Sequence, residues 1–433
     1  MRTTPRSVLV IGTGGREHAL AIALSQDPSV TEVHAAPGNP GIAAVATLHD
    51  VDPMSAPAVA DLAASLGVDL VVVGPEAPLV AGVADAVRER GIAVFGPSRA
   101  AARLEGSKAF SKGVMEAAGV PTAGARTCGT AAEVEAALDA FGAPYVVKDD
   151  ALAAGKGVVV TRDRAEALAH AALCLSREGG RVVVEEFLDG PEVSVFAVCD
   201  GTTAYALQPA QDFKRIFDGG RGPNTGGMGS YTPLAWAQDD LADVVLDRVV
   251  RPTLAEMGRR GTPFVGCLYV GLALTAAGPR VIEFNVRFGD PDVQPVLAVL
   301  ASPLGELLLA AAQGRLAGVP APAFRGGAAV SVVLASAGYP ESSSKGDVIA
   351  GVGDAAACEG VDVVHAGTAV DGDRLVTAGG RVLAVRAVGA DVPDARARAY
   401  AAADLITFPG LQRRSDIAAE PLGVVEGASV ADR

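Results

Sequence analysis

Apolar and polar positions alternate along the first hundred residues in segments of two lengths. Short apolar runs have the length of strands, and the longer stretches between them carry apolar residues at helical spacing. This alternation predicts a parallel sheet wrapped by helices. The expected strands are residues 7–11, 30–36, 69–74 and 92–95, and the expected helices are residues 16–26, 57–66 and 81–90.

The pattern changes near residue 105. Beyond it, predicted strands end in polar or glycine-rich loops, and residues 239–260 and 293–313 are predicted to be long helices, which is typical of an α+β unit. A small α+β domain is expected to close the chain, with strands at 328–335, 362–366 and 381–387 and a helix at 394–406. The predicted domains are an N-terminal parallel α/β domain at 1–104, a central domain at 105–326 and a C-terminal domain at 327–433.

Length and composition agree with a folded protein of several domains. The 433 residues, half of them hydrophobic, supply ample material for buried cores. The formal net charge of −14 disfavours broad attraction to nucleic acid or anionic membranes, because their phosphates would repel the average surface. The sequence has no apolar stretch of membrane-spanning length and no signal-peptide pattern. We therefore expect a cytoplasmic protein with neither nucleic acid nor a membrane as a partner.

The cysteines and histidines are scattered along the chain. None of the five cysteines forms a C-x-x-C pair, and the five histidines show no H-x-x-x-H spacing. Both residue types are interpreted as structural, so no zinc, redox or histidine-based catalytic site is predicted.

A glycine-rich turn, Gly12-Thr13-Gly14-Gly15-Arg16-Glu17, lies between the first predicted strand and helix. Free backbone N–H groups and the helix dipole favour an anion there, although a plain tight turn is the alternative. Similar turns at residues 37–41 and 73–76 follow two other strands, where ligands of parallel sheets gather. The turn falls short of the dinucleotide fingerprint because Glu17 stands where a third small residue is needed, so a nicotinamide dehydrogenase is disfavoured.

A second loop, residues 148–158, places two lysines around small residues between two predicted strands. A flexible loop of this kind can close over nucleotide phosphates. It is not a Walker A loop, because Lys156 is followed by Gly157 and no hydroxyl is positioned for magnesium. A P-loop NTPase is therefore the wrong class.

Residues 281–292 form the strongest candidate for a metal site. Glu283, Asn285 and Arg287 share one face of a strand by its period of two. Carboxylate and amide oxygens suit Mg²⁺, and a guanidinium binds carboxylate or phosphoryl oxygens. The simpler alternative is a solvated strand face with an ion pair.

Another glycine-dense segment, residues 219–230, follows the polar residues 212–215. Its composition argues against a regular helix or a central strand. It is interpreted as an ordered substrate loop, with a plain flexible linker as the alternative.

Several motifs in the same order resemble the phosphoribosylamine–glycine ligase family, also called glycinamide ribonucleotide synthetases. They are GGREHAL (14–20), APGN (36–39), VGPEAPLV (73–80), LEGSKAF (104–110), LAAGKGV (152–158), EEFLDG (185–190), GPNTGGMG (222–229), EFNVRFGDP (283–291), HAGT (365–368) and GGRVL (379–383). The resemblance spans essentially the whole chain. It implies a dinucleotide-fold-like N-terminal domain, an ATP-grasp core with a mobile small subdomain at about 122–192, and a C-terminal domain like those of other ATP-grasp carboxylate–amine ligases.

The resemblance also implies the reaction. Glycine would be joined to 5-phosphoribosylamine at the expense of ATP, through glycyl phosphate, to give glycinamide ribonucleotide, ADP and phosphate in purine biosynthesis. Mg²⁺ or Mn²⁺ would assist, and a monomer is the default. Such catalysis rests on positioning and charge stabilisation, which agrees with the absence of a recognisable nucleophile triad.

Site residues follow from the motifs by position. For ATP, Lys108 and Lys148 would contact the phosphates, Glu185, Glu186, Phe187 and Leu188 would line the adenine pocket, Glu192 would hold the ribose, and Lys156 would lie on the closing loop. The metal ligands would be Glu283 and Asn285. Asp212 and Arg287 would bind glycine's ammonium and carboxylate, and Lys214 would lie near the phosphate or the transferred phosphoryl group. The remaining substrate-binding candidates are Gly14, Gly15, Arg16, Gly38, Asn39, Glu76, Arg215, Asn224, Gly289 and Asp290.

The chain departs from the family pattern at three places. Lys148-Asp149-Asp150-Ala151 replaces Lys-Ala-Asp-Gly, which puts an extra carboxylate near a phosphate lysine. Phe213 replaces a histidine, so any hydrogen bond from that histidine is lost, and Asp292 replaces a glutamate.

Two alternatives stay open at this level. One is an ATP-grasp carboxylate–amine ligase with a different acceptor, which a panel of amines would distinguish. The other is a regulatory protein that binds nucleotide and has lost turnover through Asp149 and Phe213.

Overall fold

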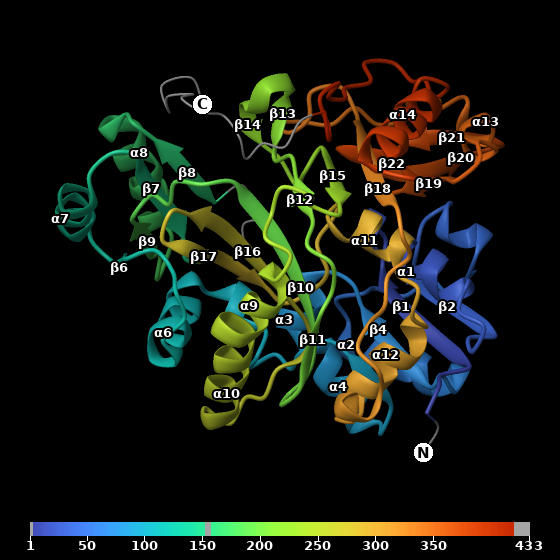
Figure 1. Ribbon diagram of the computed structural model, residues 1–433, viewed down its shortest axis with the longest axis horizontal. Helices are drawn as coiled ribbons and strands as arrows, with labels where there is room; N and C mark the ends of the chain where they lie inside the picture. Colours follow the sequence, from blue (N-terminus) through green and yellow to red (C-terminus); the bar gives the residue numbers. More distant parts are fainter. Residues whose placement is uncertain (1–2, 152–156, 420–433) are drawn as a thin grey trace.

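The computed structural model describes residues 3–151 and 157–419 in three domains (Figure 1). The N-terminal sheet has the strand order β3-β2-β1-β4-β5, and its described pairings are all parallel. The predicted parallel sheet is confirmed. Its elements are β1 (Ser7–Gly12), α1 (Gly15–Ser25), β2 (Glu32–Pro37), η1 (Ile42–Ala44), β3 (Thr47–Leu48), α2 (Ala56–Leu66), β4 (Leu70–Val73), α3 (Glu76–Ala81), α4 (Val83–Glu89) and β5 (Ala93–Phe95).

The helix expected at residues 81–90 is two helices. Gly82 separates α3 from α4 and adopts a left-handed backbone with φ of +95°, which glycine tolerates because it lacks a Cβ atom. The short α3 places Glu76 directly after β4, at the carboxyl edge of the sheet.

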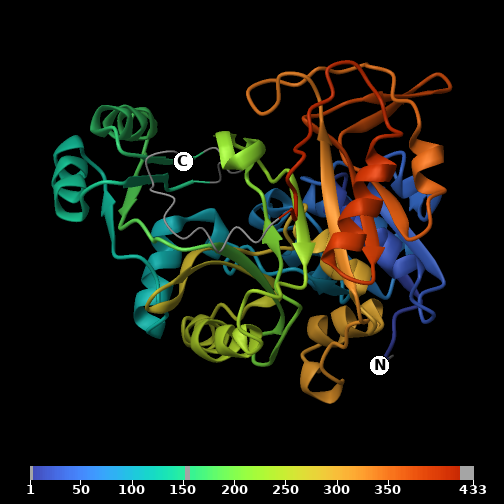
Figure 2. The same cartoon turned by 45° about the horizontal axis from the view of Figure 1, so that its top comes forward.

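The central domain contains two four-stranded sheets. The smaller unit, with order β6-β9-β7-β8, has a hydrophobic core of its own and lies at one end of the molecule in both views (Figures 1 and 2). The other sheet has the order β11-β10-β16-β17. The elements are α5 (Arg103–Gly106), α6 (Lys108–Ala118), β6 (Ala125–Cys128), α7 (Ala131–Phe141), β7 (Tyr145–Asp149), β8 (Val158–Thr161), α8 (Arg164–Leu175), β9 (Val182–Glu185), β10 (Glu192–Asp200), β11 (Ala204–Ala206), β16 (Val265–Thr275) and β17 (Gly278–Asn285).

The two long helices predicted for the central domain are interrupted. Residues 239–260 form α9 (Leu241–Val245), a π-helical turn (Leu246–Val250) and α10 (Arg251–Arg259), where Pro252 supplies no N–H for the regular ladder. Residues 293–313 form α11 (Val293–Val299) and α12 (Leu304–Ala312). The break falls before Pro303, because a residue that precedes proline disfavours helical geometry.

The glycine-dense segment is more regular than predicted. A 3-10 turn (Asp218–Gly220) leads into it, and it contains β14 (Arg221–Asn224) and the start of β15 (Gly229–Thr232). The preceding β13 (Arg215–Phe217) pairs with β14 in an antiparallel ladder. The prediction that no central strand forms there is wrong at the end of the segment, because β15 lies between β12 and β18. Positive φ at Gly219, Gly220 and Gly222 lets the chain reverse between β13 and β14.

The C-terminal domain shares its sheet with the central segment. The order β12-β15-β18-β22-β19 joins β12 (Gln211–Asp212) and β15 to β18 (Ala328–Ala335), β22 (Arg381–Gly389) and β19 (Val361–His365). The remaining elements are η4 (Leu316–Gly318), α13 (Val352–Ala356), β20 (Thr368–Asp371), β21 (Arg374–Thr377) and α14 (Val392–Ala403). The loop between β14 and β15 is thereby anchored to the C-terminal domain. Across the described residues, no helix combines the length and apolar character needed to cross a membrane.

Candidate active site

Glu283 and Asn285 lie at alternate positions near the end of β17. Glu283 faces Gly271 of β16, where a Cβ atom would come within 3.3 Å of Glu283 Cγ. Burial raises the pKa of Glu283, but Lys214, Lys148 and Lys108 lower it more, so the carboxylate is ionised at neutral pH. The Glu283 side chain thus presents an ionised carboxylate close to three lysines.

Arg287 lies beyond the end of the strand, so the expectation of three side chains on one regular strand face holds for the first two only. Its Nη2 still reaches Asn285 Oδ1 at 3.4 Å. The same nitrogen lies 2.9 Å from Glu105 Oε1, and Nε lies 3.2 Å from Glu76 Oε2. Arg287 therefore joins the predicted metal ligands to the N-terminal domain.

Glu105 is a site residue that the sequence analysis did not single out. One carboxylate oxygen holds Arg287, and the other accepts the Val286 N–H at 2.8 Å. Burial raises the pKa of Glu105, while Arg287 lowers it. Its only signal in the sequence is its place in the LEGSKAF motif, because its partners lie 181 and 182 residues away.

Acidic side chains gather beside β12. Burial raises the pKa of Asp212 well above its ordinary value, and Asp292 raises it further. Asp292 Oδ1 accepts hydrogen bonds from Ser194 Oγ at 2.7 Å and from the Tyr269 hydroxyl at 3.4 Å. The aspartate is therefore hydrogen-bonded even though it is shorter than the glutamate of the family pattern. The carboxyl groups of Asp212 and Asp292 are thus close enough for one to disfavour ionisation of the other.

Lys214 balances part of this charge. Its Nζ lies 2.6 Å from Glu192 Oε2. Burial lowers the pKa of Lys214, but Glu192 and Asp212 raise it more, so the ammonium stays protonated. The structure thus brings together Asp212, predicted for glycine, Glu192, predicted for the ribose, and Lys214, predicted for a phosphate or the transferred phosphoryl group.

Phe213 points away from this cluster into the hydrophobic core, with 2% of its surface exposed. Arg414 lies over its ring at 5.0 Å from the centroid. An apolar ring suits that buried position.

The phosphate lysines converge from two elements. Lys148 Nζ lies 2.9 Å from Glu185 Oε2 and donates to the Ile282 carbonyl at 2.9 Å. Lys108 Nζ donates to the Ala151 carbonyl at 3.2 Å. Lys156 lies outside the described residues.

Lys112 is a second residue near the predicted ATP site that the sequence motifs did not single out. Its Nζ lies 3.2 Å from Glu185 Oε1, so Glu185 is held between two lysines. Burial lowers the pKa of Lys112 to about 8. Among the other predicted adenine-pocket residues, Glu186 pairs with Arg280 at 3.1 Å, whereas Phe187 and Leu188 are half-buried.

Asp149, the extra carboxylate near Lys148, and the following Asp150 both form ion pairs. Asp149 pairs with Arg177, and as the next strand residue it faces away from Lys148. Asp150 pairs with Arg181 at 2.7 Å and accepts the Ala109 N–H at 3.0 Å. The extra carboxylate of Asp149 is therefore paired with Arg177.

The carboxylate of Glu17 packs against the turn after β1 and accepts a hydrogen bond from it. Glu17 Oε2 accepts the Gly14 N–H at 2.5 Å, and Oε1 accepts from Arg16 Nε at 2.7 Å. A Cβ atom at Gly74 would lie only 2.1 Å from Glu17 Oε1. Glu17 thus fills the space next to the turn and explains the departure from the dinucleotide fingerprint.

Asn39 has a structural role in the turn after β2. Its Nδ2 donates to the carbonyls of Thr13 at 2.8 Å and His365 at 3.0 Å, and its Oδ1 accepts the Ile42 N–H at 2.9 Å. The preceding Gly38 adopts φ of +75°. These hydrogen bonds engage both polar atoms of the Asn39 side chain. A substrate contact at this turn would therefore be made by backbone groups.

Two buried histidines join the N-terminal and C-terminal domains. The His365 N–H donates to His18 Nδ1 at 2.7 Å. Burial lowers the pKa of His18 to about 3 and that of His365 to about 4. Both rings are therefore neutral at physiological pH, as the hydrogen bond to His18 requires.

These pKa values predict loss of stability in mild acid. Unfolded histidines take up protons near pH 6.5, whereas the folded ones resist until about pH 3 to 4. The free energy of unfolding should fall as the pH drops from 6.5 toward 4, by up to about 1.4 kcal/mol per pH unit for each histidine. Urea midpoints at several pH values measure this slope. His365→Asn should flatten it and His170→Asn should not; equal slopes for wild type and His365→Asn would contradict the assignment.

The remaining substrate candidates lie at the turn after Arg287, against the first glycine turn, and in the β13–β14 ladder. A Cβ atom at Gly15 would come 2.8 Å from Asp290 Oδ1, so Asp290 lies against the first glycine turn. Gly289 packs equally closely against Asp292. Arg215 and Asn224 pair in the β13–β14 ladder, and Arg215 Nη1 donates to the Gly222 carbonyl at 2.8 Å.

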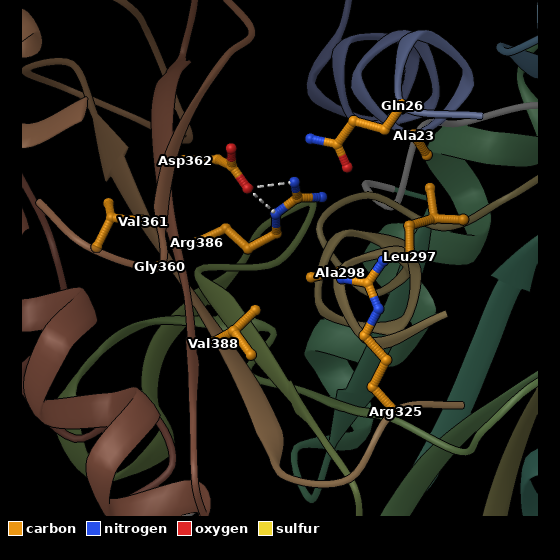
Figure 3. A pocket seen from close by; sticks show the side chains of 10 residues that line it. All are labelled: Ala23, Gln26, Leu297, Ala298, Arg325, Gly360, Val361, Asp362, Arg386 and Val388. Carbon is orange, nitrogen blue, oxygen red and sulfur yellow. Dashed lines mark hydrogen bonds and ion pairs between the residues drawn. The ribbon is translucent and has the colours of Figure 1, made fainter. Parts of the chain in front are cut away.

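A cavity of about 350 Å³ lies elsewhere, where α1 and α11 face β19 and β22 (Figure 3). Arg386 crosses it to Asp362, with Nη2 2.5 Å from Oδ2, and its Nη1 donates to the Gln294 carbonyl at 3.2 Å. The described lining contains none of the predicted site residues. It comprises Ala23, Gln26, Leu297, Ala298, Arg325, Gly360, Val361, Asp362, Arg386 and Val388.

Comparison with known families defines the class first. Models of the phosphoribosylglycinamide synthetase N domain, ATP-grasp (A) domain and C domain match residues 6–105, 106–293 and 329–420. The biotin carboxylase of Campylobacter jejuni, solved in a complex with β,γ-ATP, has a TM-score of 0.71 at 14% identity, over 95% of this chain and 93% of that chain. That likeness shows the fold alone. The chain is a three-domain ATP-grasp protein.

Its relatives define the family. The phosphoribosylamine–glycine ligase of Streptomyces coelicolor is 62% identical over 418 residues, 96% of this chain and 99% of the relative. That of Mycobacterium tuberculosis H37Rv is 55% identical over 95% and 97%. The solved phosphoribosylamine–glycine ligase of Thermotoga maritima has a TM-score of 0.82 at 33% identity, over 95% of this chain and all of that one. The chain belongs to the phosphoribosylglycinamide synthetase family, which confirms the predicted fold class and ligase activity.

Proposed function

We propose that this chain activates glycine at the end of β17 and transfers it to 5-phosphoribosylamine bound at the carboxyl edge of the N-terminal sheet. The observation that carries the proposal is the position of Arg287. It contacts Asn285 on the predicted metal side and Glu76 on the predicted acceptor side, at 3.4 and 3.2 Å. A group held by Arg287 is therefore within reach of both half-sites.

ATP would lie between the two sheets of the central domain. Lys148 and Lys108 supply positive charge for its phosphates, and Glu185 to Leu188 form the edge of the adenine pocket. Glu192 supplies a carboxylate for the ribose hydroxyls and Lys214 a protonated ammonium beside it. This distribution of charge would position the γ-phosphoryl group near Glu283.

Glu283 and Asn285 fit a divalent cation. The Glu283 carboxylate is ionised, and the Asn285 amide adds a second oxygen. Such hard oxygen donors suit Mg²⁺ or Mn²⁺, with phosphate oxygens and water completing the coordination. When bound, the ion neutralises phosphate charge as the phosphoryl group is transferred.

Glycine fits between Arg287 and the acidic cluster. Its ammonium would pair with Asp212, whose pKa is raised by burial and by the neighbouring Asp292, so that a cation beside it would favour its ionised form. Its carboxylate would be held by Arg287, with the Gly289 backbone beside it. One carboxylate oxygen attacks the γ-phosphorus, the bond to the β,γ-bridging oxygen breaks, and ADP leaves with that electron pair.

The acceptor site would be built from the turns after β1, β2 and β4. Arg16 and the Gly14–Gly15 backbone suit the phosphoribosyl group, and Glu76 suits the amine. Arg287 and Arg16 lower the pKa of Glu76 despite its burial, so it stays ionised. The amine nitrogen attacks the glycyl carbonyl carbon, the carbon–oxygen bond to phosphate breaks, and the nitrogen loses one proton.

The test combines purified protein with ATP, Mg²⁺ and glycine, with and without freshly generated 5-phosphoribosylamine. ADP release and glycinamide ribonucleotide, identified by mass spectrometry, should require both substrates. A panel of other amines distinguishes a ligase with another acceptor. ATP binding without ADP release under every condition would instead support a non-catalytic nucleotide-binding protein. Cytoplasmic location and a monomeric state stay predictions.

A further inference from the structure

Arg381 reaches from the start of β22 in the C-terminal domain toward the central domain. Its Nη1 donates to the backbone carbonyls of Gly226 and Asp290, and its Nη2 lies 3.1 Å from Asp290 Oδ2. One guanidinium thus holds two loops that are 64 residues apart in the sequence, the GPNTGGMG loop and the turn after Arg287. A rigid planar donor of this kind fixes geometry as well as charge.

Tyr339 holds the same loop from a second direction. Its hydroxyl accepts the Gly226 N–H at 3.0 Å. Its ring packs against Gly380, where a Cβ atom would lie 2.3 Å from Tyr339 Cδ2. Both backbone polar groups of Gly226 are therefore bound by side chains of the C-terminal domain.

Asp290 lies between Arg381 and the proposed acceptor half-site. Its Oδ1 accepts from Gln294 Nε2 at 2.7 Å and lies where a Cβ atom at Gly15 would clash, at 2.8 Å. The Gly14–Gly15 turn is the proposed phosphoribosyl site. The wall of that site consequently contains residues of all three domains, ordered outward as Gly15, Asp290 and Arg381.

We propose that Arg381 and Tyr339 are positioning residues for the acceptor 5-phosphoribosylamine. They fix Gly226 and Asp290 so that the acceptor pocket is complete only with the C-terminal domain in place. The glycine and metal residues Asp212, Glu283 and Arg287 have no described contact with either side chain. The inference rests on the proposed function, and it assigns to the C-terminal domain a role in acceptor binding separate from glycine activation.

Separate assays of glycyl phosphate formation and of glycyl transfer to the acceptor distinguish a role in acceptor positioning from a general structural role. Hydroxylamine can replace the acceptor: its nitrogen attacks the glycyl carbonyl, phosphate leaves, and glycine hydroxamate reports acyl phosphate formation. Arg381→Met should raise KM for 5-phosphoribosylamine by about 10- to 100-fold, because small misplacements of a binding wall carry costs of this size. Hydroxamate formation should fall far less. Tyr339→Phe should act in the same direction more weakly, and Arg381→Lys should recover part of the loss.

Arg374→Met is the matched control, because it removes an exposed arginine of the same domain, paired with Asp371, and should change neither reaction. Equal losses in both half-reactions for Arg381→Met, or an unchanged KM for the acceptor, would overturn the inference. If Arg381→Met does not fold, Arg381→Lys and Tyr339→Phe provide the test, by the same comparison of the KM for 5-phosphoribosylamine with the rate of hydroxamate formation. Wild-type protein that forms neither hydroxamate nor glycinamide ribonucleotide would instead refute the proposed function.

Discussion

Glu283→Gln should lower the rate of ADP release by about 100- to 1,000-fold, the usual loss when one charge-stabilising group is removed from an active site. The substitution keeps the shape of the side chain and removes its charge. Glu283 is ionised because three lysines outweigh its burial, so the loss falls on a carboxylate that is charged at neutral pH. Steady-state rates at saturating ATP, glycine and acceptor measure the effect.

A second readout separates metal binding from other losses. Glu283→Gln should weaken Mn²⁺ binding in the presence of ADP, observed by electron paramagnetic resonance, and should raise the Mg²⁺ concentration needed for activity. Glu341→Gln, an exposed glutamate of the C-terminal domain, provides the matched control and should behave as wild type. Normal turnover and normal Mn²⁺ binding in Glu283→Gln would remove this residue from the metal site.

Arg287→Met should both abolish turnover and destabilise the protein by about 3–5 kcal/mol, the typical cost of leaving a buried carboxylate without its partner. Glu105 and Glu76 would lose their shared cation. Burial already raises the pKa of Glu105, so without Arg287 the folded protein would bind a proton more readily than the unfolded chain. The destabilisation should therefore be smaller at pH 5 than at pH 7.

Urea midpoints at the two pH values test this prediction. Arg287→Lys keeps a positive charge and should retain more stability while still losing activity, because an ammonium cannot reproduce the planar fork. Arg251→Met breaks an exposed pair with Asp247 and should change the stability by less than about 1 kcal/mol. An Arg287→Met protein as stable as Arg251→Met at pH 7 would show that the buried pairs contribute little.

The sequence predicts local features of the site well. The period of two places Glu283 and Asn285 together on β17, and the turns after β1, β2 and β4 lie at one edge of the sheet, as expected for parallel strands. Motif order identifies the family before any geometry is known. These features depend on residues that are near one another in the chain or repeat a known pattern.

Partners that are distant in sequence could not be predicted in this way. Glu105 with Arg287 and Asn39 with His365 are 182 and 326 residues apart, and hydrophobic periodicity carries no information about such pairs. The Asn39 side chain illustrates this, since one of its hydrogen bonds goes to His365 of the C-terminal domain and the other two to Thr13 and Ile42. Interruptions such as the break before Pro303 arise where a local backbone preference overrides a continuous apolar pattern.

The most direct test of glycine activation follows an oxygen atom. Glycine labelled with oxygen-18 in its carboxylate is incubated with ATP, Mg²⁺ and 5-phosphoribosylamine, and the released phosphate is examined by mass spectrometry. If glycine's carboxylate attacks the γ-phosphoryl group, each phosphate carries one labelled oxygen from glycine and ADP carries none. Unlabelled phosphate released together with glycinamide ribonucleotide would show that the amide forms without glycyl phosphate, and would contradict the proposed roles of Arg287 and Asp212.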